Sequence, residues 1–352
     1  MKNFEYIRPA TIADAIAAAA EPGAAYLAGG TNLLDLMKGG IRRPDRLVDV
    51  SRLPELNRIE RLSGGAIRIG ALVRNADLAN DPDFATSYPA IAEALLSGAS
   101  PQLRNAATVG GNLLQRTRCG YFYDPVSACN KRVPGSGCDA RGGENRLHAV
   151  LGWSEACIAT HPSDFCVPLV ALDAVVEIEG PSGRRKVPVE ALHRLPGDTP
   201  EHDSVLGPGD LIVALWLPKE AEGFAVHARY LKVRERTSFA FAVVSAAACL
   251  RIEQGTIWDA RLALGGVAPK PWRAVAAEKI LAGCVPGPAM FRRAAEAALA
   301  DAKPSGDNGF KIELARRIIV RALTLAVAGT PERVAALPAS PFSSVAGASR
   351  AS

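Results

Sequence analysis

The chain has 352 residues, of which 48% are hydrophobic and 22% charged, with 32 Gly and 25 Pro. This length suggests two or three domains, and the composition excludes a disordered or fibrous chain. The net charge is only +5 and no sustained basic run is present, so nucleic acid is a poor candidate for a partner. No stretch approaches the ~18 consecutive apolar residues of a membrane span.

The first residues and the cysteines bear on the compartment. Residues 1–8 (MKNFEYIR) lack the apolar region of a secretory signal. We therefore expect the chain either to stay in the cytoplasm or to cross a membrane with a partner that carries the signal. Five of the seven cysteines lie between Cys119 and Cys166. Such clustering favours metal or redox chemistry over a disulfide framework.

The first half of the chain alternates helical and strand patterns. Thr11 can cap an alanine-rich helix that Gly23 ends. Further helices are expected at 31–38 and 89–97, and strands at 24–28, 46–50, 66–72, 174–179 and 210–217. Residues 113–166 carry few apolar runs and cannot easily form regular core, and a loop of this length is normally functional or disordered.

A second unit begins near Phe224. Its strands are expected at 228–233, 240–252 and 256–264, and its helices at 274–282, 288–300 and 311–328. Residues 331–352 are rich in Ala, Pro and Ser, which predicts a mobile tail.

Two short glycine motifs are candidate binding loops. Residues 28–38 read AGGTNLLDLMK, a glycine turn opening a helix, where free backbone N–H groups favour an anion such as a pyrophosphate. The motif is neither a Rossmann fingerprint nor a P-loop, and a plain helix start remains an alternative. Residues 107–112 read ATVGGN, about 75 residues further on. Together the two loops could converge on one dinucleotide.

Four cysteines form a candidate metal site. They are Cys119, Cys129, Cys138 and Cys157. Zinc modules usually place pairs of ligands two to four residues apart, so this spacing is not a zinc-finger pattern. Iron–sulfur clusters also take four thiolates at more variable spacing, and reduced, unrelated cysteines remain the alternative. The other cysteines, Cys166, Cys249 and Cys284, are expected to be buried as small hydrophobes.

The remaining polar candidates have ordinary structural interpretations. Asp164 precedes an apolar run and can serve as the N-cap of a helix, and Lys232 on a strand is expected to be solvated. None of the five histidines is spaced as in a catalytic triad or a metal site. No nucleophile–base pair is found, so no catalytic residue is assigned.

The motifs, in their order along the chain, resemble a known family. They are AGGTNLLDLMK, IGALVRNADLA (69–79), ATVGGN, HPSDF, YLKVRER and LGGVAPKPWR (264–273). Residues 3–328 are similar to FAD-binding subunits of the xanthine dehydrogenase and molybdenum hydroxylase family. The resemblance implies an α+β fold. A PCMH-type (vanillyl-alcohol oxidase-like) two-part FAD-binding domain would span 1–222, with an insertion at about 113–163. A smaller α/β domain of the CO dehydrogenase flavoprotein type would span 223–330.

The cysteine loop is most similar to that of the flavin subunits of periplasmic aldehyde oxidoreductases, which hold a [4Fe–4S] cluster there. The resemblance implies that FAD is bound by Tyr26, Leu27, Ala28, Gly29, Gly30, Thr31, Asn32, Leu33, Leu34, Thr108, Gly110, Gly111 and Asn112. It further implies that Asp164 hydrogen-bonds the ribityl or phosphate side of the flavin. Ile212 would pack on the ring, and Lys232 would lie beside the isoalloxazine. The four cysteines would ligate the cluster.

The function implied by the resemblance is electron transfer within a heterotrimer. A molybdenum-cofactor subunit would oxidise an aldehyde to a carboxylic acid, and a [2Fe–2S] subunit would pass the electrons to this chain and on to an external acceptor. Export to the periplasm with a signal-bearing partner is expected, with a cytoplasmic location as the alternative. Three other functions remain open: the flavin subunit of a benzoyl-CoA-type reductase or of a xanthine dehydrogenase-like hydroxylase, a self-sufficient PCMH-type flavoenzyme, and an assembly protein with structural zinc.

Overall fold

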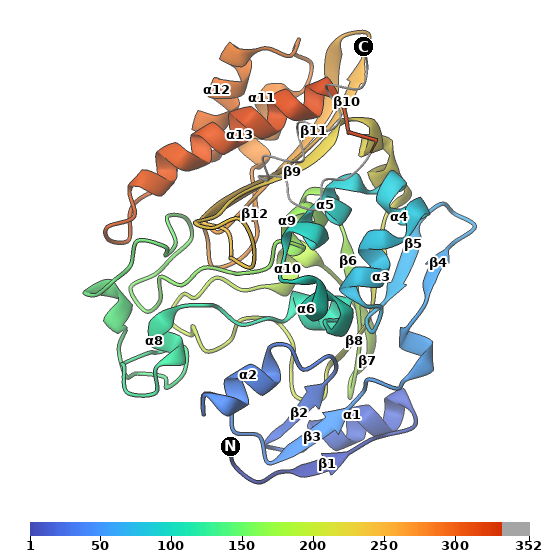
Figure 1. Ribbon diagram of the computed structural model, residues 1–352, viewed down its shortest axis with the longest axis vertical. Coiled ribbons are helices and arrows are strands. Elements are labelled where there is room, and N and C mark those ends of the chain that lie inside the picture. The colour runs from blue at the N-terminus through green and yellow to red at the C-terminus, as the bar shows by residue number, and fades with distance from the viewer. Residues whose placement is uncertain (333–352) are drawn as a thin grey trace.

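The computed structural model describes residues 1–332, which form three sheets arranged along the longest axis of the molecule (Figure 1). The predicted mobile tail, 331–352, lies outside the described residues except for its first two. Within the described part of the chain, no helix combines the length and the apolar character needed to cross a membrane.

The first sheet is parallel and has the strand order β1-β3-β2. Its elements are β1 (Glu5–Ile7), α1 (Ile12–Ala20), β2 (Ala24–Leu27), α2 (Leu33–Lys38) and β3 (Arg46–Asp49). As predicted, Thr11 caps α1, its Oγ1 accepting a hydrogen bond of 3.1 Å from the backbone N–H of Asp14. The buried face of α1 packs on this sheet through Ala15 and Ile16. Helix α2 begins at Leu33, two residues later than predicted, because the glycine turn extends through Asn32.

The second sheet is antiparallel and has the order β4-β5-β8-β6-β7. Its strands are β4 (Ile59–Arg61), β5 (Ile67–Gly70), β6 (Val175–Gly180), β7 (Gly183–Pro188) and β8 (Leu211–Leu217). The central strand β8 is almost wholly apolar because both of its faces are covered. Leu211 packs in the core shared with the first sheet, whereas Ile212 packs in the large core of the second sheet.

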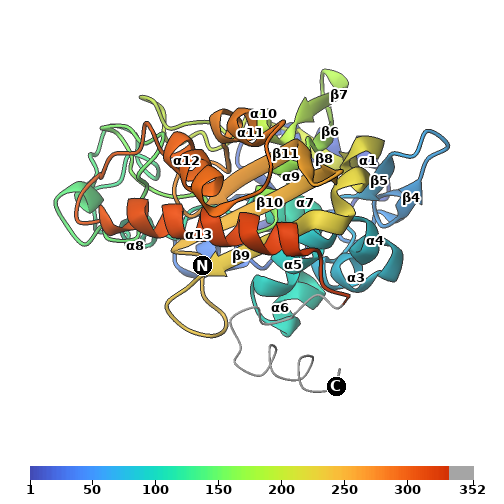
Figure 2. The ribbon, with the colours of Figure 1, turned by 90° about the horizontal axis from the view of Figure 1, so that it is seen from above.

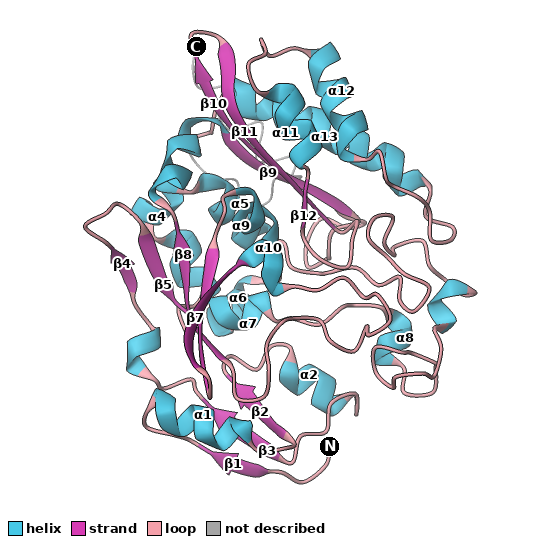
Figure 3. Cartoon of the chain, turned by 180° about the vertical axis from the view of Figure 1, so that it is seen from behind, coloured by secondary structure: helices cyan, strands magenta, loops and turns pink. Residues whose placement is uncertain are grey.

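Short helices and loops connect the strands of this sheet (Figure 3). They are η1 (Pro54–Leu56), α3 (Asn75–Asn80), α4 (Pro82–Ser87), α5 (Pro89–Ser97), α6 (Pro101–Ala106), α7 (Val109–Leu113), α8 (Gly120–Tyr123), η2 (Asp139–Arg141), α9 (Cys166–Ala171) and α10 (Val189–Leu192). The expectation that residues 113–166 hold little regular structure is confirmed, since only α8 and η2 lie wholly within it. The loop is nevertheless anchored between Cys138 and Cys157, because Val150 and Leu151 pack in the C-terminal core.

The third sheet, of order β12-β11-β10-β9, belongs to the C-terminal unit. Its elements are η3 (Lys219–His227), β9 (Ala228–Val233), β10 (Val244–Glu253), β11 (Thr256–Gly265), β12 (Trp272–Arg273), α11 (Val275–Leu281), α12 (Pro288–Ala298) and α13 (Phe310–Ala328). Helices α11–α13 cover one face (Figure 2). From the other face, Tyr230, Ala247 and Cys249 pack into the core of the second sheet, which belongs to the first unit. The two units therefore share a continuous core.

A buried lysine joins α13 to the cysteine loop. Lys311 is fully buried, and its Nζ donates to the carbonyl oxygens of Leu147 (2.9 Å), His148 (2.8 Å) and Gly266 (2.6 Å). Burial lowers the pKa of Lys311 to about 7. The side chain thus fixes the cysteine loop, at a point between Cys138 and Cys157, against the third sheet.

Replacing Lys311 should destabilise the protein. In Lys311→Met, three buried carbonyl groups lose their donor, and we expect the free energy of unfolding to fall by about 2–3 kcal/mol. Denaturant unfolding measures the change. The control is Lys279→Met on the exposed side of α11, which should have little effect. An equal loss of unfolding free energy in Lys311→Met and Lys279→Met would contradict the proposed role of the three hydrogen bonds from Lys311.

Candidate functional site

The two predicted glycine turns lie against each other. A Cβ on Gly29 would fall 2.0 Å from the carbonyl oxygen of Ala106, so only glycine permits this approach. Gly30 has a φ of +71°, a conformation that side chains rarely adopt. In the second turn, the N–H of Gly110 donates to the carbonyl of Ala71 at 2.8 Å. The turn after β2 is therefore packed directly on the segment that leads into α7.

Two cavities adjoin at these turns. The larger has a volume of about 1330 Å³ and the smaller about 450 Å³, and both are bordered by residues 29–32 and by Gly111. Of the loop residues predicted to bind a ligand, only Leu27 lines neither cavity. The shape suits an elongated ligand with two bulky ends and a narrow centre at the glycine turns.

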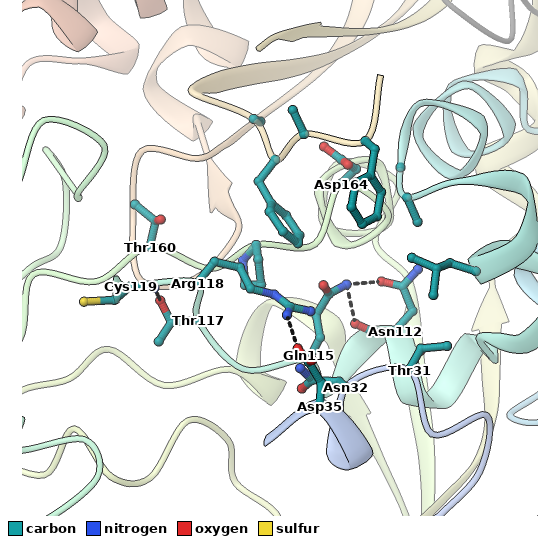
Figure 4. A pocket seen from close by; sticks show the side chains of 18 of the residues that line it. Thr31, Asn32, Asp35, Asn112, Gln115, Thr117, Arg118, Cys119, Thr160 and Asp164 are labelled. Carbon is teal, nitrogen blue, oxygen red and sulfur yellow. Dashed lines mark hydrogen bonds and ion pairs between the residues drawn. The ribbon is translucent and has the colours of Figure 1, made fainter. Parts of the chain in front are cut away.

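Polar side chains surround this narrow centre (Figure 4). The Oδ1 of Asn112 accepts hydrogen bonds from Ser163 Oγ (2.7 Å) and Gln115 Nε2 (2.6 Å). Asn32 Oδ1 accepts from the N–H of Arg116 at 2.9 Å, but Asn32 Nδ2 is buried without a hydrogen-bond partner among residues 1–332. An unpartnered buried donor beside two glycine turns fits a ligand with acceptor oxygens, such as a pyrophosphate.

A buried ion pair forms part of the wall of the larger cavity. Lys232 Nζ lies 2.7 Å from Asp164 Oδ2 and also donates to the carbonyl of Ser97 at 3.1 Å. Tyr230 donates its hydroxyl to Asp164 Oδ1 at 2.6 Å. The carboxylate is thereby satisfied on both oxygens, which a buried charge requires.

The structure overturns two expectations about this pair. Asp164 is not the helix cap, because Ser163 Oγ accepts the N–H of Cys166 at 3.2 Å at the start of α9. Lys232 is not solvated but only 8% exposed, since the first domain covers that part of β9. Ile212 lines the smaller cavity and Lys232 the larger, so these two candidate residues belong to different ends of the site.

The four predicted metal-binding cysteines meet around one small cavity. The backbones of Cys129 and Cys138 pair in an isolated antiparallel β-bridge. None of the four cysteines forms a disulfide. Burial raises the pKa of Cys119 to about 12 and also raises the pKa of Cys138 and of Cys157. Cys119 lines both this cavity and the large one, which places the cysteine centre directly beside the candidate ligand site.

The spacing of the thiols does not suit a single metal ion. Four thiolates at 2.3 Å from zinc would lie about 3.8 Å apart. Among residues 1–332, the only group of three or more potential ligands with all donor atoms within 4.8 Å is His161, Cys166 and His193. Among these residues, therefore, no three of the four thiols lie within 4.8 Å of one another, as the ligands of one tetrahedral ion would.

The group formed by His161, Cys166 and His193 is itself a poor metal site. His161 Nδ1 accepts the N–H of Ser163 at 3.3 Å, so the proton of the neutral ring is on Nε2 and that nitrogen cannot ligate. Burial lowers the pKa of both histidines, which keeps them neutral. Cys166 is completely buried, as predicted.

The sequence analysis missed several residues that the fold brings to the site. His148 Nε2 lies 3.2 Å from Cys119 Sγ, and Glu93 accepts the backbone N–H of Tyr230 at 2.6 Å. Neither contact could be predicted from the spacing of these residues in the sequence. Of the cysteines expected to be buried, Cys249 is buried whereas Cys284 is half-buried.

Two family models match the chain. Residues 2–220 match the FAD binding domain in molybdopterin dehydrogenase, and residues 229–326 match the CO dehydrogenase flavoprotein C-terminal domain. These matches, with the mixed helices and sheets described above, confirm the predicted fold class.

Curated relatives align over nearly their whole length. The aldehyde oxidoreductase FAD-binding subunit PaoB of Escherichia coli (strain K12) is 49% identical over 92% of this chain and 98% of its own. The carbon monoxide dehydrogenase medium chain of Hydrogenophaga pseudoflava is 28% identical over 92% and 97%.

Solved structures have the same fold. Carbon monoxide dehydrogenase from Hydrogenophaga pseudoflava aligns with a TM-score of 0.72 at 29% identity, covering 93% of this chain and 98% of that one. Quinoline 2-oxidoreductase from Pseudomonas putida 86 aligns with a TM-score of 0.71 at 26% identity, covering 93% and 99%.

Adding a methyl group at the junction of the glycine turns should weaken FAD binding. In Gly29→Ala the new Cβ would collide with the Ala106 carbonyl, so the turns must separate, and we expect at least ~10-fold lower FAD affinity, or about 1.4 kcal/mol. The FAD content of the purified chain measures this. Gly142→Ala, whose Cβ meets open space, should retain FAD. Full FAD content in Gly29→Ala would show that the close packing of Gly29 on the Ala106 carbonyl is not needed for FAD binding.

Breaking the buried ion pair should destabilise the protein. Lys232→Met leaves the Asp164 carboxylate buried and uncompensated, and we expect the free energy of unfolding to fall by about 3–5 kcal/mol. In the double variant, Asp164→Asn removes that charge and should recover part of the loss. Denaturant unfolding of the single and double variants tests this. Additive losses would show that the two side chains are not coupled.

Proposed function

Because the chain belongs to the FAD-binding subunits of the molybdenum hydroxylase family, we propose that it is the FAD and [4Fe–4S] electron-transfer subunit of a molybdenum-dependent aldehyde oxidoreductase. The observation that carries this proposal is the position of Cys119. Its side chain lines both the cavity of the four thiols and the large cavity beside the glycine turns. Two redox groups held at these places would be neighbours.

The same observation orients the dinucleotide. The larger cavity borders Cys119 and contains the Asp164–Lys232 pair, so we place the isoalloxazine end there. The glycine turns and Asn32 Nδ2 would hold the pyrophosphate, and the smaller cavity with Ile212 would take the adenosine end. This assignment moves Ile212 away from the flavin ring, where the resemblance had suggested it.

FAD can accept electrons one at a time and can pass on two electrons together. An iron–sulfur cluster carries one electron at a time. The residues of this chain bind and orient those groups. Lys232 and Tyr230 neutralise and fix Asp164, so that the wall of the cavity is rigid and its charge is balanced. Cys129 and Cys157 are buried whereas Cys119 and Cys138 are half-buried, so the centre would be partly shielded from water, and that shielding contributes to its redox potential.

A cationic side chain supports an anionic centre at the cysteines. Burial raises the pKa of Cys157, and the charge of Lys131 opposes that shift. Lys131 lines the thiol cavity and is held by Asp203 and by the carbonyl of Pro200 at 2.7 Å. A fixed cation here compensates the negative charge that four thiolates bring to a cluster.

The substrate chemistry belongs, in this proposal, to another subunit. Relatives of this chain are named as a FAD-binding subunit and as a medium chain, which supports a multi-subunit enzyme. We place aldehyde oxidation on a molybdenum-cofactor subunit, with a [2Fe–2S] subunit between it and this chain. An external acceptor then takes the electrons.

Metal analysis tests the proposal. Purified anaerobically with its partner subunits, the wild-type complex should contain one FAD and about eight irons per trimer, four in the [4Fe–4S] cluster of this chain and four in two [2Fe–2S] clusters elsewhere. Cys129→Ser should lose about four irons because one of four ligands is gone, while FAD is retained. Iron, acid-labile sulfide, zinc and FAD are measured in parallel.

The matched control is Cys284→Ser, a half-buried cysteine in the C-terminal unit, which should keep the wild-type iron content. About four irons in all three proteins would leave a flavin subunit without a cluster in this loop. Zinc in place of iron would support the structural-zinc alternative instead.

A further inference from the structure

His148 occupies an unusual position between the two candidate redox sites. Its ring lines the large cavity, as does Cys119, and its Nε2 lies 3.2 Å from Cys119 Sγ. The residue is only 7% exposed. Its backbone is held in place because the carbonyl oxygens of Leu147 and His148 both accept from Lys311 Nζ.

The direction of the contact follows from chemistry. A thiolate that ligates a metal can only accept a hydrogen bond, so the imidazole must donate from Nε2. Its Nδ1 then carries a lone pair, and this buried atom has no partner in the described part of the chain. A buried nitrogen left unpaired costs free energy that an apolar side chain of similar size would avoid. Packing alone therefore does not account for a histidine here.

We propose that His148 is a positioning residue that donates its Nε2–H to the ligand Cys119 and thereby sets the reduction potential of the [4Fe–4S] cluster. The inference rests on the function proposed above. Reduction adds negative charge to the cluster and its sulfurs, and a hydrogen-bond donor stabilises that added charge. The contact therefore raises the potential of the cluster. It acts on the cysteine that borders the large cavity, on the side of the centre nearest the proposed flavin ring.

The test compares two variants in the full complex. His148→Leu removes the N–H donor at similar volume, and His148→Gln retains an amide donor. Each is titrated potentiometrically, and the cluster is followed by the low-temperature EPR signal that should be missing from Cys129→Ser. We expect His148→Leu to favour the oxidised cluster about tenfold more than wild type, a shift of about 59 mV to lower potential. His148→Gln should stay near the wild-type potential.

Iron and FAD contents, measured on the same samples, separate this inference from the proposed function. Wild-type protein without the additional irons would overturn both. If both variants keep their iron and the potential does not move, or if both shift equally, only the role of His148 is overturned. Loss of iron in His148→Leu with full retention in His148→Gln would support a donor that positions Cys119. Loss in both would show that ring shape, and not the N–H, is needed.

Discussion

Two buried carboxylates from the first domain hold strand β9, and the geometry of the whole site depends on them. Glu93 of α5 accepts the backbone N–H of Tyr230 at 2.6 Å and pairs with Arg229 Nε at 3.0 Å. Asp164, just before α9, pairs with Lys232 and accepts the Tyr230 hydroxyl. Taking these charges out of water is costly, and the cost is offset only when every oxygen finds its donor. The pairing therefore fixes how the C-terminal sheet sits on the first domain.

The large cavity is a consequence of this docking. Its walls come from the glycine turns of the first domain, from Asp164 and Lys232, and from the loop that follows β9. If β9 shifted, the Asp164 carboxylate would lose both donors and the cavity would lose one wall. A cofactor-binding domain joined to a second unit by charged side chains at the cavity itself is thus rigid where the ligand must be oriented. Binding and domain assembly depend on the same residues.

The sequence could predict what is encoded locally and not what the fold brings together. Helix 89–97 and strand 228–233 occur at the predicted residues, because proline at a helix start and an apolar strand pattern are local signals. The glycine loops and the four cysteines were singled out by their residue types, and the fold gathers each set around a cavity, while their ligands stay predictions. Asp164 and Lys232 are 68 positions apart, and His148 and Cys119 are 29 apart. Their contacts arise only from tertiary packing, so each looked like an ordinary cap, surface lysine or isolated histidine.

The construction of the cysteine loop explains how so irregular a segment can hold a defined centre. One end follows directly from α7 beside the glycine turns. Between Cys138 and Cys157 the loop is held by the C-terminal unit, where Asn145 Oδ1 accepts the N–H of Asp307 at 2.7 Å and the carbonyl of Ala149 accepts from Ser305 Oγ at 2.7 Å. The loop is therefore fixed at its start and at this point without any metal, and the middle segment between them carries three of the four thiols. Burial favours the protonated form of the thiols, so a bound cluster would have to displace their protons, and assembly of the centre is coupled to the order of this middle segment. Such an arrangement separates formation of the cluster from formation of the flavin cavity, although Cys119 belongs to the walls of both.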